Sequence, residues 1–204
     1  MSKRPYLLGL TGSIGMGKTT TAGLFAEAGV CVWDADAVVE RLYAMGGKGV
    51  GPVGDLVPGA VREGIVERSK LRAALALDAR LLARLEAVIH PLVAKERIDF
   101  IDEIVKSDRQ LAVFDIPLLF ETGAENWLDG VVVVSSPARV QRQRVMARQG
   151  MDAKTFALIL ARQMPDAEKR ARANFIIDTS QGIEDARSQV QAVIQRIHQG
   201  KARA

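Results

Sequence analysis

Residues 11–20 read TGSIGMGKTT and follow the apolar run YLLGL at 6–10. Gly12, Gly17, Lys18 and Thr19 match G-x-x-x-x-G-K-[ST], the pattern of a phosphate-binding loop, in which glycines let backbone N–H groups turn inward around phosphate oxygens. A buried strand precedes the loop, and the helical pattern KTTTAGLFAEAG follows it. The alternative is a glycine-rich turn without a ligand. The motif and its context together favour a nucleotide site.

Each part of this loop has an expected role. We expect Lys18 to reach the β- and γ-phosphates of the nucleotide, and the Thr19 hydroxyl to bind Mg²⁺. The helix that begins here directs the positive end of its dipole toward the anion. The expected nucleotide-binding residues are Gly12, Ser13, Ile14, Gly15, Met16, Gly17, Lys18, Thr19 and Thr20.

The composition indicates a protein with a sizeable core. Hydrophobic residues make up 48% of the 204 residues, and no stretch approaches the roughly 18 uninterrupted apolar residues of a membrane span. The first residues, MSKRPY, show no apolar signal segment, and the single cysteine, Cys31, excludes an internal disulfide. Because nucleotides are abundant inside the cell, we predict a cytoplasmic protein that binds no membrane.

The positive charge is concentrated in one part of the chain. Residues 137–172, here named the basic segment, hold nine basic and three acidic residues, so this segment carries +6 while the rest of the chain carries −2. A local excess of this kind indicates a bound anion rather than a general affinity for polyanions. Few aromatic residues accompany the basic ones, which argues against nucleic-acid binding.

Apolar runs alternate with helical patterns along the chain, which is typical of an α/β fold with a parallel sheet covered on both faces. We predict strands at 6–10, 30–34, 110–115, 130–135 and 174–178. We predict helices at 18–28, 35–45, 69–89, 92–106, 137–149, 152–164 and 182–198. His90-Pro91 is expected to break the helical pattern, and the stretch 46–67, rich in glycine, is expected to be a loop.

Four acidic residues lie at or after the ends of predicted strands, at the sheet edge where ligands bind in such folds. Asp34 is either a helix N-cap or part of the site. Asp36 is the better candidate for accepting a proton from an attacking hydroxyl, although helix-dipole stabilisation alone could explain it. Asp115 is expected to hold Mg²⁺ directly or through water, and Glu121 lies on the same edge. His90 is more simply explained as a packing or hydrogen-bonding residue than as a catalytic one.

Together these residues carry a resemblance that runs over essentially the whole chain. The stretches GLTGSIGMGKTT, DAD, IHPLV, DIPLLFE, the pattern at Gln141, Arg144 and Arg148, and Gln163 occur in the order and spacing of dephospho-CoA kinases. The chain departs from that family pattern at Ser13, where a second glycine is common, and at Asn174, where aspartate is usual.

The resemblance implies an enzyme that transfers the γ-phosphate of ATP to the ribose 3′-hydroxyl of dephospho-CoA, the last step of coenzyme A synthesis. It implies a three-layer P-loop kinase fold with a five-stranded parallel sheet, as one domain over 1–204 with a helical substrate-binding insertion at about 46–106 and a lid at about 137–172. By the same resemblance Lys18, Asp36 and Arg148 are catalytic, and ATP and Mg²⁺ are the cofactors. The implied substrate-binding residues are Asp34, Asp36, His90, Pro117, Leu118 and Glu121, and the implied metal ligands are Thr19 and Asp115.

Two other functions were weighed from the residues. A nucleoside or nucleotide kinase on the same scaffold would share the phosphate loop but would not account for HPL and PLLFE together. A nucleotide-dependent switch is disfavoured, because a guanine-reading Asn/Thr-Lys-x-Asp run is missing from the sequence. The sequence leaves the oligomeric state open.

Overall fold

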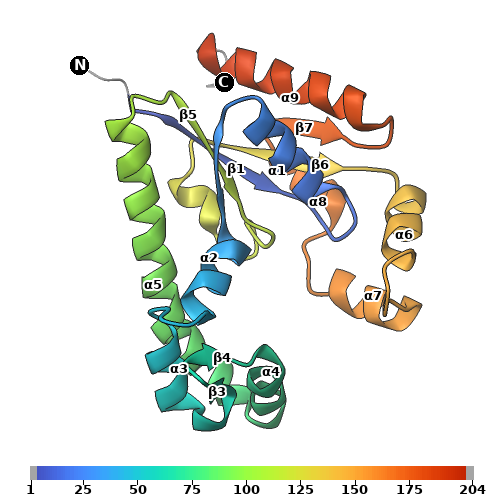
Figure 1. The fold of residues 1–204 in the computed structure, drawn as a ribbon. Helices are drawn as coiled ribbons and strands as arrows, with labels where there is room; N and C mark the ends of the chain where they lie inside the picture. Colours follow the sequence, from blue (N-terminus) through green and yellow to red (C-terminus); the bar gives the residue numbers. More distant parts are fainter. Residues whose placement is uncertain (1–3, 201–204) are drawn as a thin grey trace. The chain divides into compact units, whose positions relative to one another are not determined.

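A computed structural model describes residues 4–200, apart from the side chain of Ala79 (Figure 1). The chain divides into two compact units: the first runs up to Trp33 and resumes at Ile104, and the second is Asp34–Glu103. The first unit contains the five-stranded sheet, and the second contains helices and a short hairpin. No helix within residues 4–200 has the length and apolar character needed to cross a membrane.

The sheet of the first unit has the strand order β2-β5-β1-β6-β7, and its strands run parallel. Its strands are β1 (Tyr6–Thr11), β2 (Cys31–Asp34), β5 (Leu111–Asp115), β6 (Gly130–Ser135) and β7 (Phe175–Asp178). The central strand β1 pairs with β5 so that Leu10 lies opposite Asp115. The ends of β1 and β5 therefore meet where the phosphate loop begins.

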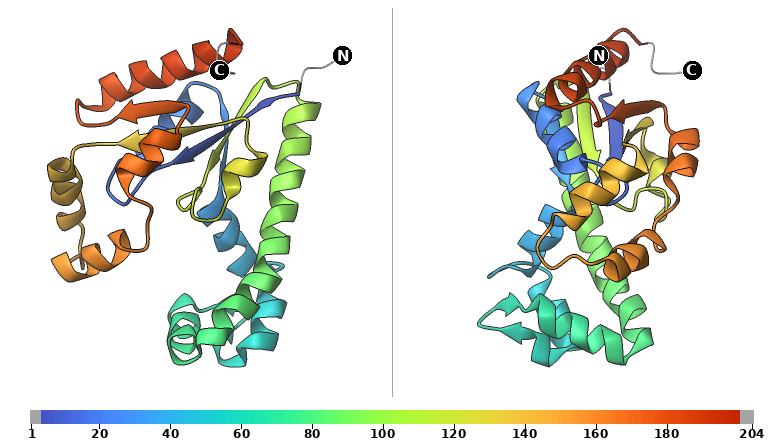
Figure 2. Two further views of the ribbon diagram at one scale, coloured as in Figure 1. Left: turned by 180° about the vertical axis from the view of Figure 1, so that it is seen from behind. Right: turned by 90° about the vertical axis from the view of Figure 1, so that its right-hand side faces the viewer.

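The two faces of the sheet are covered by different elements, as the alternation of side chains along a strand requires. Leu8, Leu10 and Val132 pack into a core with residues of α1 (Lys18–Glu27) and α9 (Ile183–His198), which lie side by side (Figure 2). Val131 and Val133, one position out of phase, pack on the opposite face against residues 119–124. The turn η2 (Ala124–Trp127) and the preceding residues therefore form the third layer.

The predicted strands are confirmed, each to within one residue of its expected bounds. The helices predicted at 18–28, 35–45 and 182–198 are found as α1, α2 (Ala35–Tyr43) and α9. The signal is strong here because short, continuously apolar runs are typical of parallel strands buried on both faces.

The helix break predicted at His90-Pro91 is wrong. One helix, α5 (Ala79–Lys106), continues through Pro91. Leu81, Leu85 and Ile89 are buried and share one face of this helix, and their packing outweighs the cost of about 3 kcal/mol of a proline in a helix interior.

The interruption lies further upstream instead. There α4 (Arg68–Leu77) ends at Asp78, whose backbone is extended. The Asp78 carboxylate accepts a hydrogen bond from Arg80 N at 2.8 Å and so caps the start of α5.

The loop predicted at 46–67 is also wrong, since most of it is ordered into short elements. It contains α3 (Val50–Leu56), the 3-10 turn η1 (Pro58–Ala60), and a hairpin of β3 (Val61–Arg62) and β4 (Ile65–Val66). Pro52 lies in the first turn of α3, where its missing N–H leaves no bond unmade. Glu63 and Gly64 form the hairpin turn with φ angles of 52° and 75°, as a two-residue turn with both φ positive requires.

The basic segment consists of three helices rather than the two predicted. They are α6 (Ala138–Met146), α7 (Ala153–Leu160) and α8 (Asp166–Arg172). The last helix, α8, was not predicted, because it has only seven residues and its Lys and Arg side chains were expected to be solvated. Arg148 follows the end of α6 instead of lying within a helix at 137–149.

Candidate active site

The phosphate loop, residues 12–19, connects β1 to α1 and is packed against the basic segment. A Cβ atom at Gly12 would lie 2.7 Å from the backbone oxygen of Val134, so only glycine fits there. Gly15 has a φ of 79°, and a Cβ atom on it would overlap Val145 of α6. Tertiary contacts thus require these two glycines, in addition to any demand from a bound phosphate.

Lys18 and Asp115 form an ion pair at the mouth of this loop. Lys18 Nζ lies 2.6 Å from Asp115 Oδ1, and the Asp115 residue is 2% exposed. Asp115 ends β5, opposite Leu10 of β1, which explains how residues 97 positions apart meet. A cation and a carboxylate at a loop that turns N–H groups toward an anion suit a nucleotide with a divalent metal ion. Thr19, with an exposed side chain, follows Lys18 in the first turn of α1.

A cavity of about 320 Å³ opens beside the loop. It is lined by residues of the phosphate loop, the start of α1, the basic segment, the turn after β7 and the start of α9: Gly15, Gly17, Thr20, Thr21, Arg144, Arg148, Thr179, Gly182, Ile183 and Ala186. Two guanidinium groups and a helix N-terminus on one cavity favour an anionic ligand such as a nucleotide.

Arg144 is engaged within the protein. Its guanidinium donates to Thr179 Oγ1 at 2.8 Å and to the Thr179 backbone oxygen at 2.7 Å, and the Thr179 hydroxyl in turn donates to the backbone oxygen of Met16 at 2.8 Å. Arg144 therefore holds the turn after β7 against the phosphate loop.

Arg148 also lines the cavity, but it reaches it from the turn that follows α6. Its side chain is exposed, and within residues 4–200 it has no hydrogen bond or ion pair of its own. Arg144 and Arg148 both line the cavity, although Arg148 lies beyond the end of α6.

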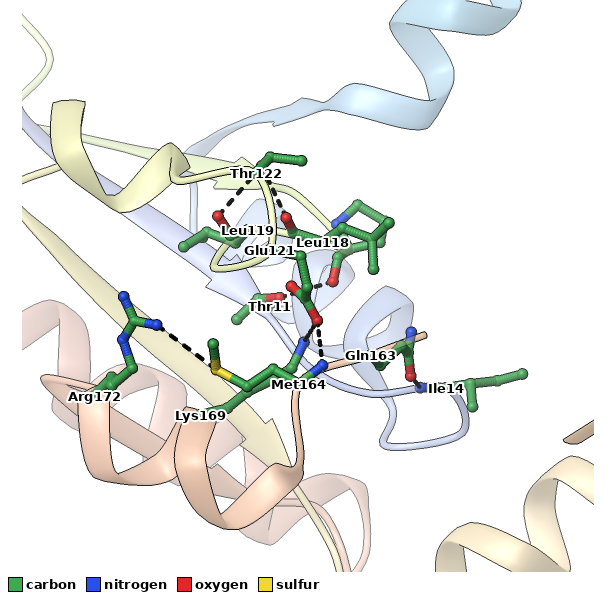
Figure 3. A network of polar contacts seen from close by, with 11 residues as sticks. Thr11, Ile14, Leu118, Leu119, Glu121, Thr122, Gln163, Met164, Lys169 and Arg172 are labelled. Carbon is green, nitrogen blue, oxygen red and sulfur yellow. Dashed lines mark hydrogen bonds and ion pairs between the residues drawn. The ribbon is translucent and has the colours of Figure 1, made fainter. Parts of the chain in front are cut away.

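Two glutamines of the basic segment bond to one residue of the phosphate loop. Gln141 Nε2 donates to the Ile14 backbone oxygen at 2.8 Å, and Ile14 N donates to Gln163 Oε1 at 3.1 Å. Figure 3 shows Gln163 directed at Ile14 from the chain that leads into α8. Both polar groups of the Ile14 backbone are therefore satisfied by side chains of the basic segment.

Glu121 and Lys169 form the second contact between this segment and the rest of the first unit (Figure 3). Lys169 Nζ lies 2.8 Å from Glu121 Oε1, and the Lys169 side chain is completely buried. The same oxygen accepts a hydrogen bond from Met164 N at 2.7 Å. Burial raises the pKa of Glu121, but the ion pair with Lys169 and the hydrogen bond from Met164 N outweigh that effect and hold the pKa below its ordinary value.

The other residues predicted after β5 have backbone roles in the structure. The Pro117 backbone oxygen accepts a hydrogen bond from Thr11 Oγ1 at 3.1 Å, which ties this turn to the end of β1. The Leu118 oxygen accepts from the Thr122 hydroxyl at 2.8 Å, while the Leu118 side chain is 40% exposed. Asn174, the departure from the family pattern, accepts from Val131 N at 2.8 Å and so fixes the start of β6.

Three predicted site residues belong to the second unit. Asp34 accepts hydrogen bonds from Asp36 N at 2.8 Å and Ala37 N at 3.0 Å, which confirms that it is the N-cap of α2. Asp36 lies in the first turn of α2 and is exposed. His90 is exposed on α5, so it is not the packing residue that the simpler explanation expected.

Lys169 and Thr179 carry structural roles that were not predicted. A buried lysine in a basic stretch has no sequence signal that separates it from its exposed neighbours, because its partner Glu121 is 48 residues away. Thr179 has no local signal either, since both its partners come from distant segments.

We predict a pH-dependent cost for the substitution Glu121→Gln. It leaves the buried Lys169 without a carboxylate, so the free energy of unfolding at pH 7 falls by about 3 kcal/mol. Because the pKa of Glu121 is lowered in the folded state, the ion pair contributes above the ordinary glutamate range and is lost as the pH falls through and below it. The difference between wild type and variant should therefore shrink from pH 7 to pH 3.

Urea unfolding across this pH range measures the difference. Glu168→Gln is the control, because Glu168 is exposed on α8, the helix that carries Lys169. It should change the free energy of unfolding by less than about 0.5 kcal/mol. A Glu121→Gln deficit that stays constant with pH would contradict the assigned cause.

The chain is similar to known proteins over nearly its full length. The dephospho-CoA kinase family model matches residues 6–185. A dephospho-CoA kinase from Cereibacter sphaeroides is 53% identical over 196 residues, covering 96% of this chain and 98% of the relative.

Solved structures agree in fold. The crystal structure of TT1252 from Thermus thermophilus, 34% identical, superposes with a TM-score of 0.81 over 95% of this chain and 98% of that one. A dephospho-CoA kinase from Campylobacter jejuni, 21% identical, has a TM-score of 0.67 over 96% of this chain and 98% of that one. The fold is therefore that of P-loop kinases. The chain belongs to the dephospho-CoA kinase family, whose members phosphorylate dephospho-CoA with ATP in the last step of coenzyme A synthesis.

Proposed function

We propose that this chain transfers the γ-phosphoryl group of ATP to the ribose 3′-hydroxyl of dephospho-CoA and releases ADP and CoA. The observation that carries the proposal is the pairing of Lys18 with the buried Asp115 at the mouth of the phosphate loop. The bond between the γ-phosphorus of ATP and its bridging oxygen breaks, and that oxygen leaves as part of ADP. A new bond forms between the γ-phosphorus and the 3′-hydroxyl oxygen, whose proton passes to a base. Such a reaction takes place where ATP is supplied, so we expect the chain to act in the cytoplasm.

The phosphate loop is the proposed binding site for the triphosphate. Residues 12–20 would surround the β- and γ-phosphates with backbone N–H groups, and Lys18 would exchange part of its contact with Asp115 for a phosphate oxygen. Thr19 and Asp115 are the proposed residues for Mg²⁺, which neutralises phosphate charge when bound. The cavity beside Arg144 and Thr179 has room for the remainder of the nucleotide.

Asp36 is the proposed general base. It lies two residues beyond the end of β2, the strand that neighbours β5 in the sheet, and its carboxylate is exposed. Asp34 is expected to act mainly through α2, because its carboxylate is bonded to the backbone there.

The acceptor is proposed to bind through Asp34, Asp36, His90, Pro117 and Leu118, within the predicted insertion at about 46–106 and the residues that flank it. For Glu121, the bonds to Lys169 and Met164 favour anchoring of the basic segment over direct substrate contact.

The basic segment is the proposed lid, and Arg148 is its proposed catalytic residue. Gly150, with a φ of 75° and open space around its Cα, lies between α6 and α7 and allows the chain to bend there. An exposed arginine on the nucleotide cavity can move onto the transferring phosphate, where positive charge stabilises the transition state.

A transfer assay with MgATP, with and without dephospho-CoA, tests the function. We expect ADP release that depends on dephospho-CoA, and Lys18→Ala should lower kcat by about 10²–10³, because one electrostatic contact to the transferring group is lost. Nucleosides and nucleoside monophosphates serve as competing acceptors. Faster transfer to one of these acceptors would favour the nucleoside kinase alternative.

We predict that Asp36→Asn lowers kcat by about 10²-fold or more while the affinity for ATP is retained, because the amide keeps the shape but cannot take the proton. The matched control is Asp34→Asn, two residues away, since asparagine caps a helix as well as aspartate does. Single-turnover kinetics of both variants report the chemical step. Equal losses, or a larger loss at Asp34, would reverse the proposed roles.

We predict that Arg148→Ala lowers kcat by at least about tenfold, the effect of losing one charge-assisted hydrogen bond to phosphate. Arg148→Lys should restore little if the contact is bidentate. Arg142→Ala is the control, because Arg142 is an exposed arginine on α6 that does not line the cavity. Steady-state kinetics compare the three, and similar turnover in Arg148→Ala and Arg142→Ala would remove the lid role.

A further inference from the structure

The two glutamines that bond to Ile14 lie on opposite sides of α7 in the chain. Gln141 belongs to α6, and Gln163 follows α7 by three residues. The excursion of residues 142–162, which includes Arg148, is thus attached at both ends to one residue of the phosphate loop, through the N–H and the C=O of Ile14. Ile14 is two residues beyond Gly12 and directly precedes Gly15, so its backbone sets the direction of the loop that follows.

The environment of these glutamines indicates fixed positions rather than surface contacts. Gln141 is 6% exposed, and Gln163 is partly buried. Gln163 is followed by Met164, whose N–H is bonded to Glu121, and Glu121 is paired with the fully buried Lys169.

Two further contacts hold α8. Ser135 Oγ donates to Asp166 at 2.8 Å, and Arg172 pairs with Glu125 while lying 4.7 Å from the centre of the Phe120 ring. The helix α8, which follows Gln163 in the chain, is therefore attached to the last residue of β6 and to residues 120–125 after β5.

A buried ion pair is weak evidence for stability, because well-packed apolar residues of similar volume often serve as well. Its better-attested use is to select one arrangement of the chain. The Glu121–Lys169 pair selects the arrangement that brings Gln163 to Ile14. Gln141 lies at the other end of the excursion, within α6, so the helix itself holds it and no ion pair is needed to place it.

We propose that Gln141 and Gln163 are positioning residues that act as a pair. They fix the two peptide groups on either side of the Ile14 Cα and so set the phosphate loop for the nucleotide, while the same bonds fix both ends of the excursion that carries Arg148. This proposal rests on the proposed kinase reaction for its kinetic consequences. Its consequence for nucleotide binding stands without turnover. Loss of either glutamine loosens the backbone at the same residue, Ile14, so the two losses are not independent.

The test uses Gln141→Met, Gln163→Met and the double variant in the full chain. Methionine keeps the length of the side chain and removes its amide. Each single variant should weaken MgADP binding, measured by calorimetry, about fivefold, the effect of one neutral hydrogen bond. The double variant should lose clearly less than the product of the single losses. The KM for ATP should rise in parallel, while the KM for dephospho-CoA stays within about twofold, a split that a general loss of folded protein would not give.

Gln143→Met is the matched control, an exposed glutamine on the same helix, and it should bind MgADP as wild type does. Thermal melts establish that each variant is folded at the assay temperature. If Gln163→Met is not folded, Gln163→Asn keeps the amide but shortens its reach, and it should still weaken MgADP binding.

Unchanged MgADP affinity in the folded variants, or a double loss equal to the product of the single losses, would overturn the paired role. A wild-type protein that binds MgADP but fails to phosphorylate dephospho-CoA would overturn the proposed function instead. The two failures are therefore distinguishable.

Discussion

The backbone of the phosphate loop is the constraint on which the rest of the first unit depends. A loop that turns its N–H groups toward an anion cannot also satisfy itself, so other parts of the chain must hold it in shape. Here Gly12 lies against β6, Ile14 is bonded to Gln141 and Gln163, and Met16 is bonded to Thr179. The sheet, the turn after β7 and the basic segment together provide these contacts, and each comes from more than 100 residues away in the chain.

Charge in the basic segment is divided between two uses. Arg148 remains exposed on the cavity beside the phosphate loop, while Arg144 bonds to Thr179 and Lys169 is buried against Glu121. The excess of positive charge was expected to indicate a bound anion. Part of that charge instead holds the basic segment against the rest of the first unit. Placement by charged and polar groups is directional, whereas apolar packing would tolerate several arrangements of the same helices. If the basic segment is the proposed lid, such contacts would return it to one position after it moves.

Much of the architecture could be read from local pattern. The five strands were predicted to within one residue, because buried parallel strands are continuous apolar runs that few other elements resemble. The helix through Pro91 was not predicted, since the local penalty of proline is visible in the sequence but the burial of Leu81, Leu85 and Ile89 on one face is not. The hairpin of β3 and β4 was not predicted either. A glycine-rich stretch is interpreted as a loop, and the sequence does not show that its residues pair as strands.

The sequence by itself determined the phosphate loop, the strand ends that carry Asp34 and Asp115, and the family, because each depends on a motif of fixed spacing. The tertiary structure alone decided which polar side chains bond to other groups of the protein. Lys18 meets Asp115, Glu121 meets Lys169 rather than open solvent, and two glutamines 22 positions apart meet on Ile14. These pairings depend on how the strands are ordered and how the basic segment returns to the sheet. The sequence contains the residues that make these contacts, but the distances between residues far apart in the chain are set only by the folded structure.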